Sequence, residues 1–327
     1  MRIAIDLLGG DHAPDVLIQA VAQSAAKHPE REFLAVGTPD VLEKLSASKN
    51  VIPVPCGSVM AMDEDVRNFL RKKDSSIWVA TELVKNGEAQ AVVSAGSTGA
   101  QMAVATVLLS RIEGVSRPAI GIVVPTPEGG KLLLDIGANA DCDGEMLLQF
   151  GEMGAVYAQT VLGIANPRVA LLCNGTEEHK GNQLTKDAFQ RMKASNLHFI
   201  GNREGRDILA GGYDVMVADG MSGNIALKST EGAAGHILSM LKTELTANPL
   251  RKLGAALIMP GLRKIKKAMD YQEYGGAPLL GVKGVSIVCH GSSKERAIVQ
   301  AIEVAATCVE KNMVRQLTEA VAVKGKE

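Results

Sequence analysis

Short apolar runs recur along the chain, most of them followed by polar turns that contain glycine. Most of these runs are apolar at every position, which is typical of parallel strands that are buried on both faces. Stretches with helical periodicity lie between them, so the pattern predicts repeated β-α-β units and an α/β fold. The predicted strands span residues 2–6, 33–37, 91–94, 120–124, 132–136, 169–172, 198–201, 214–218 and 285–288.

One predicted helix, residues 75–85, shows how the sheet is covered. Ile77, Ala80, Thr81 and Val84 fall on one face at helical spacing, and Asn86-Gly87 follows as a stop signal. That spacing is typical of a helix packed on a sheet. Because no low-complexity linker, repeat or sharp change in composition interrupts the chain, we expect a single catalytic α/β domain over residues 1–327.

Residues 245–270 break the pattern and predict a basic amphipathic helical hairpin within that domain. Leu262, Ile265 and Met269 repeat at helical spacing beside basic side chains, and Pro260-Gly261 should separate one helix from the next. The apolar wedge of this hairpin would be Leu257, Ile258 and Met259, and its basic flank Arg263, Lys264, Lys266 and Lys267. Such a hairpin could touch an anionic lipid surface, or pack on a partner subunit or on the core.

Composition narrows the class of protein. Hydrophobic residues make up 46% of the 327 residues and charged residues 22%, which excludes a disordered chain. The formal net charge of −1 argues against nucleic-acid binding by the whole surface. The amino terminus lacks the features of a signal peptide, so we expect a cytoplasmic protein. The five cysteines are widely spaced with no C-x-x-C pair, which favours reduced, buried thiols over zinc or disulfides.

Common site signatures are absent. The chain contains no G-x-G-x-x-G, no P-loop, no H-E-x-x-H and no G-x-S-x-G. A nicotinamide-binding site, an ordinary nucleotide triphosphatase, a metalloprotease and a serine hydrolase therefore have no local support.

Polar, glycine-rich turns instead follow several predicted strands, where open α/β sheets bind their ligands. The turn at residues 95–100 offers hydroxyls and backbone N–H groups to an anion at the start of a helix, and the turn at 219–224 offers N–H groups and an amide. Each turn alone has a plain structural interpretation as a helix cap, but their number favours an active site. The six turns are residues 6–14, 95–100, 135–139, 174–182, 201–205 and 219–224.

In order and spacing, these turns resemble the PlsX phosphate acyltransferases of bacterial phospholipid synthesis over essentially the whole chain. The resemblance also includes Gly275-Gly276-Ala277-Pro278 and His290-Gly291-Ser292. It implies transfer of a long-chain fatty acyl group from acyl carrier protein to inorganic phosphate, and an isopropylmalate-dehydrogenase-like α/β/α fold with a mostly parallel sheet. It further implies a homodimer, no metal or nucleotide cofactor, and an acyl phosphate product that a membrane glycerol-3-phosphate acyltransferase uses for phospholipid synthesis.

We assign site residues as hypotheses from these turns. Lys180 would supply positive charge to phosphate, Asp219 would orient that lysine or accept a phosphate proton, and His12 could assist proton transfer. A thiolate is a good leaving group, so positioning could provide most of the rate. The substrate-binding candidates are Gly10, Asp11, Ser94, Gly96, Ser97, Thr98, Gly99, Asn139, Asn202, Gly223 and Asn224.

Two alternatives stay open at this point. One is a short-chain acyl-coenzyme A phosphotransacylase, which would share the phosphate chemistry. The other is a non-catalytic protein that docks on acyl carrier protein or on a membrane, which any turnover would exclude. Membrane contact would make the cytoplasmic protein peripherally membrane-associated.

Overall fold

The computed structural model describes residues 1–62, 64, 68, 70–268 and 275–324. Within them, eleven strands form one sheet in the order β3-β2-β1-β4-β11-β10-β5-β6-β9-β7-β8. The strands are β1 Arg2–Asp6, β2 Glu32–Gly37, β3 Val51–Pro55, β4 Ala91–Ser94, β5 Ala119–Thr126, β6 Gly129–Leu134, β7 Val169–Leu172, β8 Phe199–Arg203, β9 Val215–Val217, β10 Ala277–Leu280 and β11 Val285–Val288. The helices are α1 Asp15–Lys27, α2 Pro39–Leu42, α3 Ser76–Lys85, α4 Thr98–Leu108, α5 Gly144–Thr160, α6 Gln183–Ala194, α7 Gly220–Thr246, α8 Pro249–Ala268, α9 Glu295–Glu310 and α10 Met313–Lys324.

All nine predicted strands are present within a few residues of their expected bounds, and so is the helix predicted at 75–85. Two strands, β3 and β10, were not predicted. Both contain proline, which removes a backbone donor and usually argues against a strand. In β3 the prolines stand on the edge strand, where a missing N–H has little cost, and β10 is only 4 residues long.

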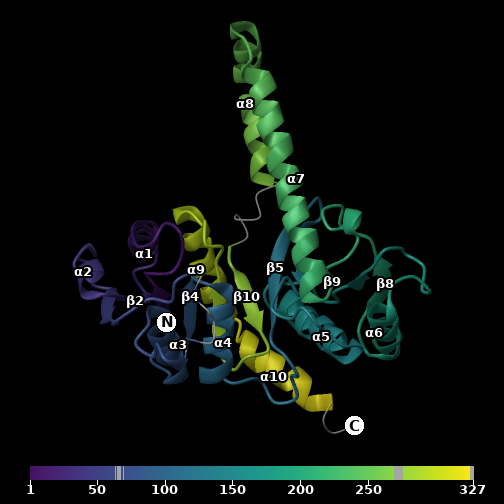
Figure 1. Ribbon diagram of the computed structural model, residues 1–327, viewed down its shortest axis with the longest axis horizontal. Helices are drawn as coiled ribbons and strands as arrows, with labels where there is room; N and C mark the ends of the chain where they lie inside the picture. Colours follow the sequence, from purple (N-terminus) through teal and green to yellow (C-terminus); the bar gives the residue numbers. More distant parts are fainter. Residues whose placement is uncertain (63, 65–67, 69, 269–274, 325–327) are drawn as a thin grey trace.

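Helices cover both faces of the sheet, which confirms the three-layer α/β/α fold (Figure 1). Side chains alternate between the two faces along each strand: Ile3 and Ile5 join one apolar cluster while Ala4 joins another. Helices α1, α5, α6, α9 and α10 pack on the first face. Helices α3 and α4 cover one half of the second face, and α7 covers the other half.

The direction of the strands divides the sheet into two parallel halves. Strands β3, β2, β1, β4 and β11 are parallel, as are β6, β9, β7 and β8. Between the halves, β10 and β5 are each antiparallel to both neighbours, so the two halves point in opposite directions. The sheet is therefore mostly parallel, as the resemblance implied.

The register of the central strands brings the carboxyl ends of both halves to the same level. Val288, the last residue of β11, pairs with Ala277, and Leu279 pairs with Ile120. The next residue of β5, Gly121, pairs with Leu134 at the end of β6. The two ends therefore differ by about one residue, or 3.3 Å, in height and lie three strand spacings apart, about 14 Å. Turns from both halves can meet over the centre of the sheet.

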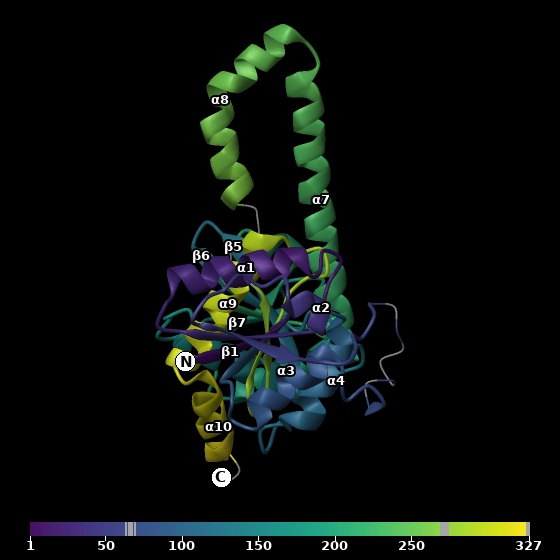
Figure 2. The same ribbon diagram turned by 90° about the vertical axis from the view of Figure 1, so that its left-hand side faces the viewer.

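Helices α7 and α8 form a hairpin that extends away from the body of the molecule (Figure 2). The prediction of a break at Pro260-Gly261 is wrong, because α8 continues through Pro260. The chain turns instead between Thr246 and Pro249, where Asn248 Oδ1 accepts from the Arg251 N–H at 2.9 Å. Proline suits the first position of a helix, where its missing N–H leaves no acceptor unpaired.

This correction changes the position of the apolar wedge. Leu257, Ile258 and Met259 lie within α8 and are 79%, 51% and 38% exposed, whereas Leu250, next to the turn, is 80% exposed. The hairpin also begins earlier than expected, because its first arm is α7. The side chains of Arg263, Lys264, Lys266 and Lys267 lie outside the described residues.

Candidate active site

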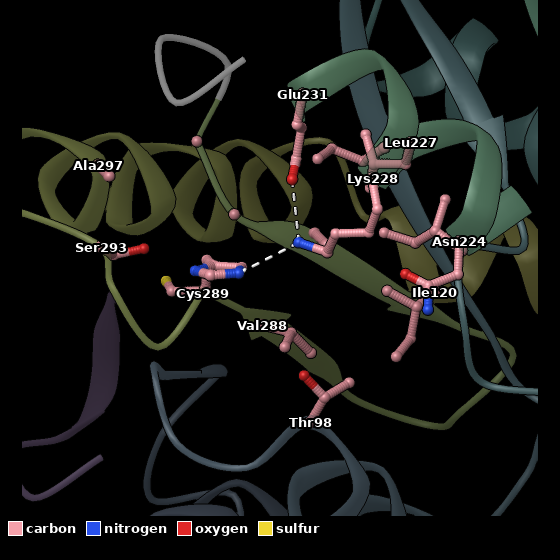
Figure 3. Close-up of a pocket in the computed structure, with 16 residues that line it drawn as sticks. Thr98, Ile120, Asn224, Leu227, Lys228, Glu231, Val288, Cys289, Ser293 and Ala297 are labelled. Carbon is pink, nitrogen blue, oxygen red and sulfur yellow. Dashed lines mark hydrogen bonds and ion pairs between the residues drawn. The ribbon is translucent and has the colours of Figure 1, made fainter. Parts of the chain in front are cut away.

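A groove of about 230 Å³ runs over the centre of the sheet between α4 and α7 (Figure 3). Its walls come from both halves of the molecule: α4 contributes Thr98, α7 contributes Asn224, Leu227, Lys228 and Glu231, and β11 with its following turn contributes the opposite end. Most of the floor is aliphatic. The apolar lining residues are Ile120, Ile122, Ile136, Leu227, Ala277, Val288 and Ala297.

A cationic group extends from α7 into this groove. Lys228 Nζ lies 3.0 Å from Glu231 Oε2 and 3.2 Å from His290 Nε2, as the dashed lines in Figure 3 mark. His290 Nδ1 lies 2.8 Å from Ser292 Oγ. The Ser292 N–H also lies 3.2 Å from that Nδ1, so the imidazole is held between α7 and the turn after β11. Lys228 therefore carries its charge in the groove while a carboxylate and an imidazole fix its position.

The turn before α4 is held by a buried carboxylate. Ser94 Oγ donates to Asp6 Oδ2 at 2.7 Å and accepts from the Gly96 N–H at 3.0 Å. Asp6 Oδ1 accepts from the Leu8 N–H at 3.0 Å. Burial raises the pKa of Asp6, and its hydrogen bonds oppose that shift. This relay fixes the β1 and β4 turns relative to each other.

Helix α4 begins beside the groove, directly after this relay. The first N–H groups of a helix, here those of Thr98, Gly99 and Ala100, have no acceptor within the helix. The N-cap residue Ser97 makes no side-chain cap bond. Thr98, which lines the groove, is exposed. This end of α4 can accept an anion through backbone donors and the helix dipole.

The β1 turn packs so closely on its neighbours that it requires glycine. A Cβ at Gly9 would lie 2.5 Å from the Gly96 nitrogen, and Gly10 has a φ of 104°. The Asp11 N–H donates to the Gly291 carbonyl at 2.8 Å. Gly10 is therefore needed for the shape of the turn. The side chains of Asp11 and His12 are exposed and do not line the groove.

Asp135 organises the turn after β6. Its Oδ1 accepts from the N–H groups of Ile120, Gly137 and Ala138 at 3.1–3.2 Å, and its Oδ2 accepts from the N–H and the amide of Asn139 at 2.8 and 2.9 Å. Burial raises the pKa of Asp135, and these bonds oppose the shift. The Asn139 amide also donates to the Pro118 carbonyl. Asn139 is thus used in holding the turn.

The start of α7 is already capped from within. Asp219 Oδ1 accepts from the Ser222 N–H at 2.8 Å, its carbonyl accepts from the Gly223 N–H at 2.9 Å, and the Gly220 N–H donates to the Asn139 carbonyl. The Gly223 N–H is therefore occupied within the helix. One turn further, Asn224 presents its side chain to the groove.

The remaining candidates lie farther along the sheet. Lys180 is exposed on the turn after β7, does not line the groove and forms no ion pair with Asp219 among the described residues. Its stem covers Gly175. Asn202 is buried, and its amide donates to the Glu177 carbonyl at 2.9 Å, which ties β8 to the same turn. The structure thus brings Thr98 and Asn224 together and leaves Lys180, Asn202 and His12 outside the groove.

Sequence reasoning missed Lys228 and Glu231. Their spacing alone resembles a solvated i,i+3 ion pair, but Asn224, Lys228 and Glu231 follow each other at i, i+4 and i+7 from a turn already chosen as a candidate. This shared helical face was the sequence feature from which Lys228 and Glu231 could have been predicted as site residues. Cys289 also lines the groove, and burial raises the pKa of its thiol to about 12, so it serves as apolar lining.

No cluster of three or more His, Cys, Asp or Glu side chains in the described part of the chain could hold a metal ion. Among the described helices, none is both long and apolar enough to span a membrane.

Sequence comparison identifies the family. The family profile described as "Fatty acid synthesis protein" matches residues 1–316. The chain is 52% identical to the phosphate acyltransferase of Heliobacterium modesticaldum, with 98% of this chain and 97% of that protein covered. It is 51% identical to a phosphate acyltransferase of Desulfitobacterium hafniense, with 97% and 96% covered. The chain belongs to the PlsX family of acyltransferase enzymes.

Solved structures with low sequence identity share the fold. The EutD phosphotransacetylase from Staphylococcus aureus aligns with a TM-score of 0.61 at 14% identity, covering 94% of each chain. A phosphotransacetylase from Streptococcus pyogenes gives 0.60 at 16% identity, covering 95% of this chain and 94% of that one. A 4-hydroxythreonine-4-phosphate dehydrogenase from Klebsiella pneumoniae gives 0.54 at 15% identity, with 94% and 99% covered. These likenesses extend the α/β/α assignment to a wider group of enzymes.

The relay below α4 gives the first prediction. Ser94→Ala removes one hydrogen bond from the buried Asp6 carboxylate and leaves the Gly96 N–H without its acceptor. The variant should lower the free energy of unfolding in urea by about 2–3 kcal/mol. Ser97→Ala is the matched control, because Ser97 makes no side-chain cap bond, and should change it by less than about 0.5 kcal/mol. Equal losses in the two variants would show that the relay does not hold the turn.

Proposed function

We propose that this PlsX enzyme transfers a long-chain fatty acyl group from acyl carrier protein to inorganic phosphate. The observation that carries the proposal is the groove itself, whose aliphatic floor meets the open first turn of α4 and the charge of Lys228. Family membership supports acyl transfer to phosphate. The acyl carrier protein donor and the long acyl chain go beyond the comparisons.

Phosphate would bind at the amino-terminal turn of α4. The N–H groups of Thr98 and Gly99 supply directed donors, and Lys228 supplies compensating charge through its position in the groove. The acyl chain would lie along the aliphatic floor. The alternative assignment of the charge to Lys180 stays a proposal, as does the hypothesis that Asp219 accepts a phosphate proton; each would require the turn concerned to approach the groove.

The reaction needs only two bond changes. A phosphate oxygen attacks the thioester carbonyl carbon, a C–O bond forms, and the C–S bond breaks as the carrier leaves as a thiolate. Because a thiol has a pKa near 8.5, no strong general acid is required, and the solvent can return the proton. The protein would therefore act mainly by holding phosphate against the thioester.

We further propose that the product is acyl phosphate for phospholipid synthesis, consumed by a membrane glycerol-3-phosphate acyltransferase. The exposed apolar side chains of the hairpin support peripheral contact with an anionic lipid surface. A homodimer is also proposed, and sedimentation velocity would test it by giving the mass of one chain or of two.

The purified enzyme, incubated with palmitoyl-acyl carrier protein and phosphate, should form acyl phosphate that hydroxylamine traps as palmitoyl hydroxamate. Hydroxamate should increase with phosphate concentration and be absent without it. Acetyl-coenzyme A in a parallel reaction tests the alternative that the phosphotransacetylase neighbours suggest.

Turnover with acetyl-coenzyme A alone would replace the proposal with the short-chain reaction. A folded protein that turns over neither donor would instead support the non-catalytic docking alternative.

The hairpin gives a separate prediction. Leu257→Glu and Ile258→Glu place charges on exposed apolar positions, and should reduce co-sedimentation with phosphatidylglycerol vesicles at least tenfold. Val107→Glu, an exposed apolar residue on α4, is the control and should bind as the wild type does. Undiminished vesicle binding by the hairpin variants would assign this apolar surface to a protein interface.

A further inference from the structure

A second cavity, of about 610 Å³, lies beside the groove. The two are neighbours along three segments: Met102 follows Thr98 by one turn of α4, Pro118 precedes Ile120, and Ala138 follows Ile136. The first residue of each pair lines the second cavity and the other lines the groove. A linear ligand could therefore extend from one into the other past the amino-terminal turn of α4.

The second cavity has a more polar lining than the groove. The groove floor is mostly aliphatic, whereas the second cavity is lined by Thr106, Arg111, Ser116, Arg117 and Asn139 together with Met102, Pro118 and Ala138. An acyl thioester of phosphopantetheine likewise has an apolar part and a polar part. Its acyl chain is apolar, while its arm carries two amides and ends in a phosphate.

Two arginines give this cavity a positive charge that the described acidic side chains do not neutralise. Arg111 is fixed, because its backbone bridges to Val282 and its guanidinium donates to the Ser116 and Val115 carbonyls. Arg117 is exposed, and neither arginine forms an ion pair with an acidic side chain in the described part of the chain. A planar guanidinium suits bidentate binding of phosphate.

We propose that this cavity binds the pantetheine arm of the acyl donor, with Arg117 on its phosphate. The inference rests on the proposed function, which requires a thioester donor. Helix α4 has 11 residues and is about 16 Å long, and Arg111 follows its carboxyl end. Because Arg117 lines the same cavity as Arg111, the span from the first turn of α4 to these arginines is on the scale of an extended arm. The thioester would then lie at the α4 turn, the acyl chain in the groove and the arm in the second cavity.

The test compares two small donors that differ only in the phosphate, palmitoyl-4′-phosphopantetheine and palmitoyl-pantetheine. Their dissociation constants are measured as competitive inhibitors against palmitoyl-acyl carrier protein, and directly by calorimetry. In the wild type the phosphate should tighten binding about tenfold. In Arg117→Gln this difference should disappear, while palmitoyl-pantetheine binds as before and the KM for inorganic phosphate is unchanged.

Arg315→Gln, an exposed arginine on α10, is the matched control and should keep the tenfold difference. A wild type that binds both donors equally, or an Arg117→Gln variant that keeps the difference, overturns the proposal. Weaker binding of palmitoyl-acyl carrier protein alone, with the small donors unaffected, also overturns it and assigns Arg117 to the surface of the carrier protein. Normal donor discrimination without turnover would leave this site in place and reject the proposed reaction.

Discussion

The antiparallel pair formed by β10 and β5 determines where this enzyme can have a site. Parallel sheets bind ligands at the carboxyl ends of their strands, so two parallel halves that point in opposite directions would normally have sites at opposite edges. Here the register through Ala277, Leu279 and Gly121 brings the ends of β11 and β6 to within about one residue in height. The groove lies at that level, and α4 and α7 form its walls because each begins at a turn of a different half.

Buried carboxylates make this arrangement rigid. Asp6 ties the β1 turn to the β4 turn through Ser94, and Asp135 gathers five N–H donors at the end of β6. Neither carboxylate has a counter-ion among these contacts, so hydrogen bonds alone offset the cost of burial. Asp6 and Asp135, which stand in two of the turns chosen as candidates, therefore hold the backbone of those turns in place. Thr98, the first residue of α4, lines the groove beside them.

The sequence predicted the fold better than the site. Buried strands such as 91–94 and 285–288 stand out as uninterrupted apolar runs, whereas β3 and β10 contain proline and could be found only from their neighbours in the sheet. The helix break was placed at Pro260 because proline usually ends a helix. Asparagine before a helix and proline at its first position are also known helix-start signals, and Asn248 and Pro249 begin α8 in this way. In the site, Thr98 and Asn224 were identified from turn chemistry. Lys228 and His290 lie 62 positions apart, and only the fold brings them within 3.2 Å of each other.

The central claim is that phosphate binds at the first turn of α4 beside Lys228. Crystals of the enzyme soaked with tungstate, a heavy analogue of phosphate, would locate the anion directly by its anomalous signal. The account predicts a tungstate within hydrogen-bonding distance of the Thr98 and Gly99 N–H groups, displaced by added inorganic phosphate. A phosphate-displaceable tungstate on the turn of Lys180, with none at α4, would contradict it.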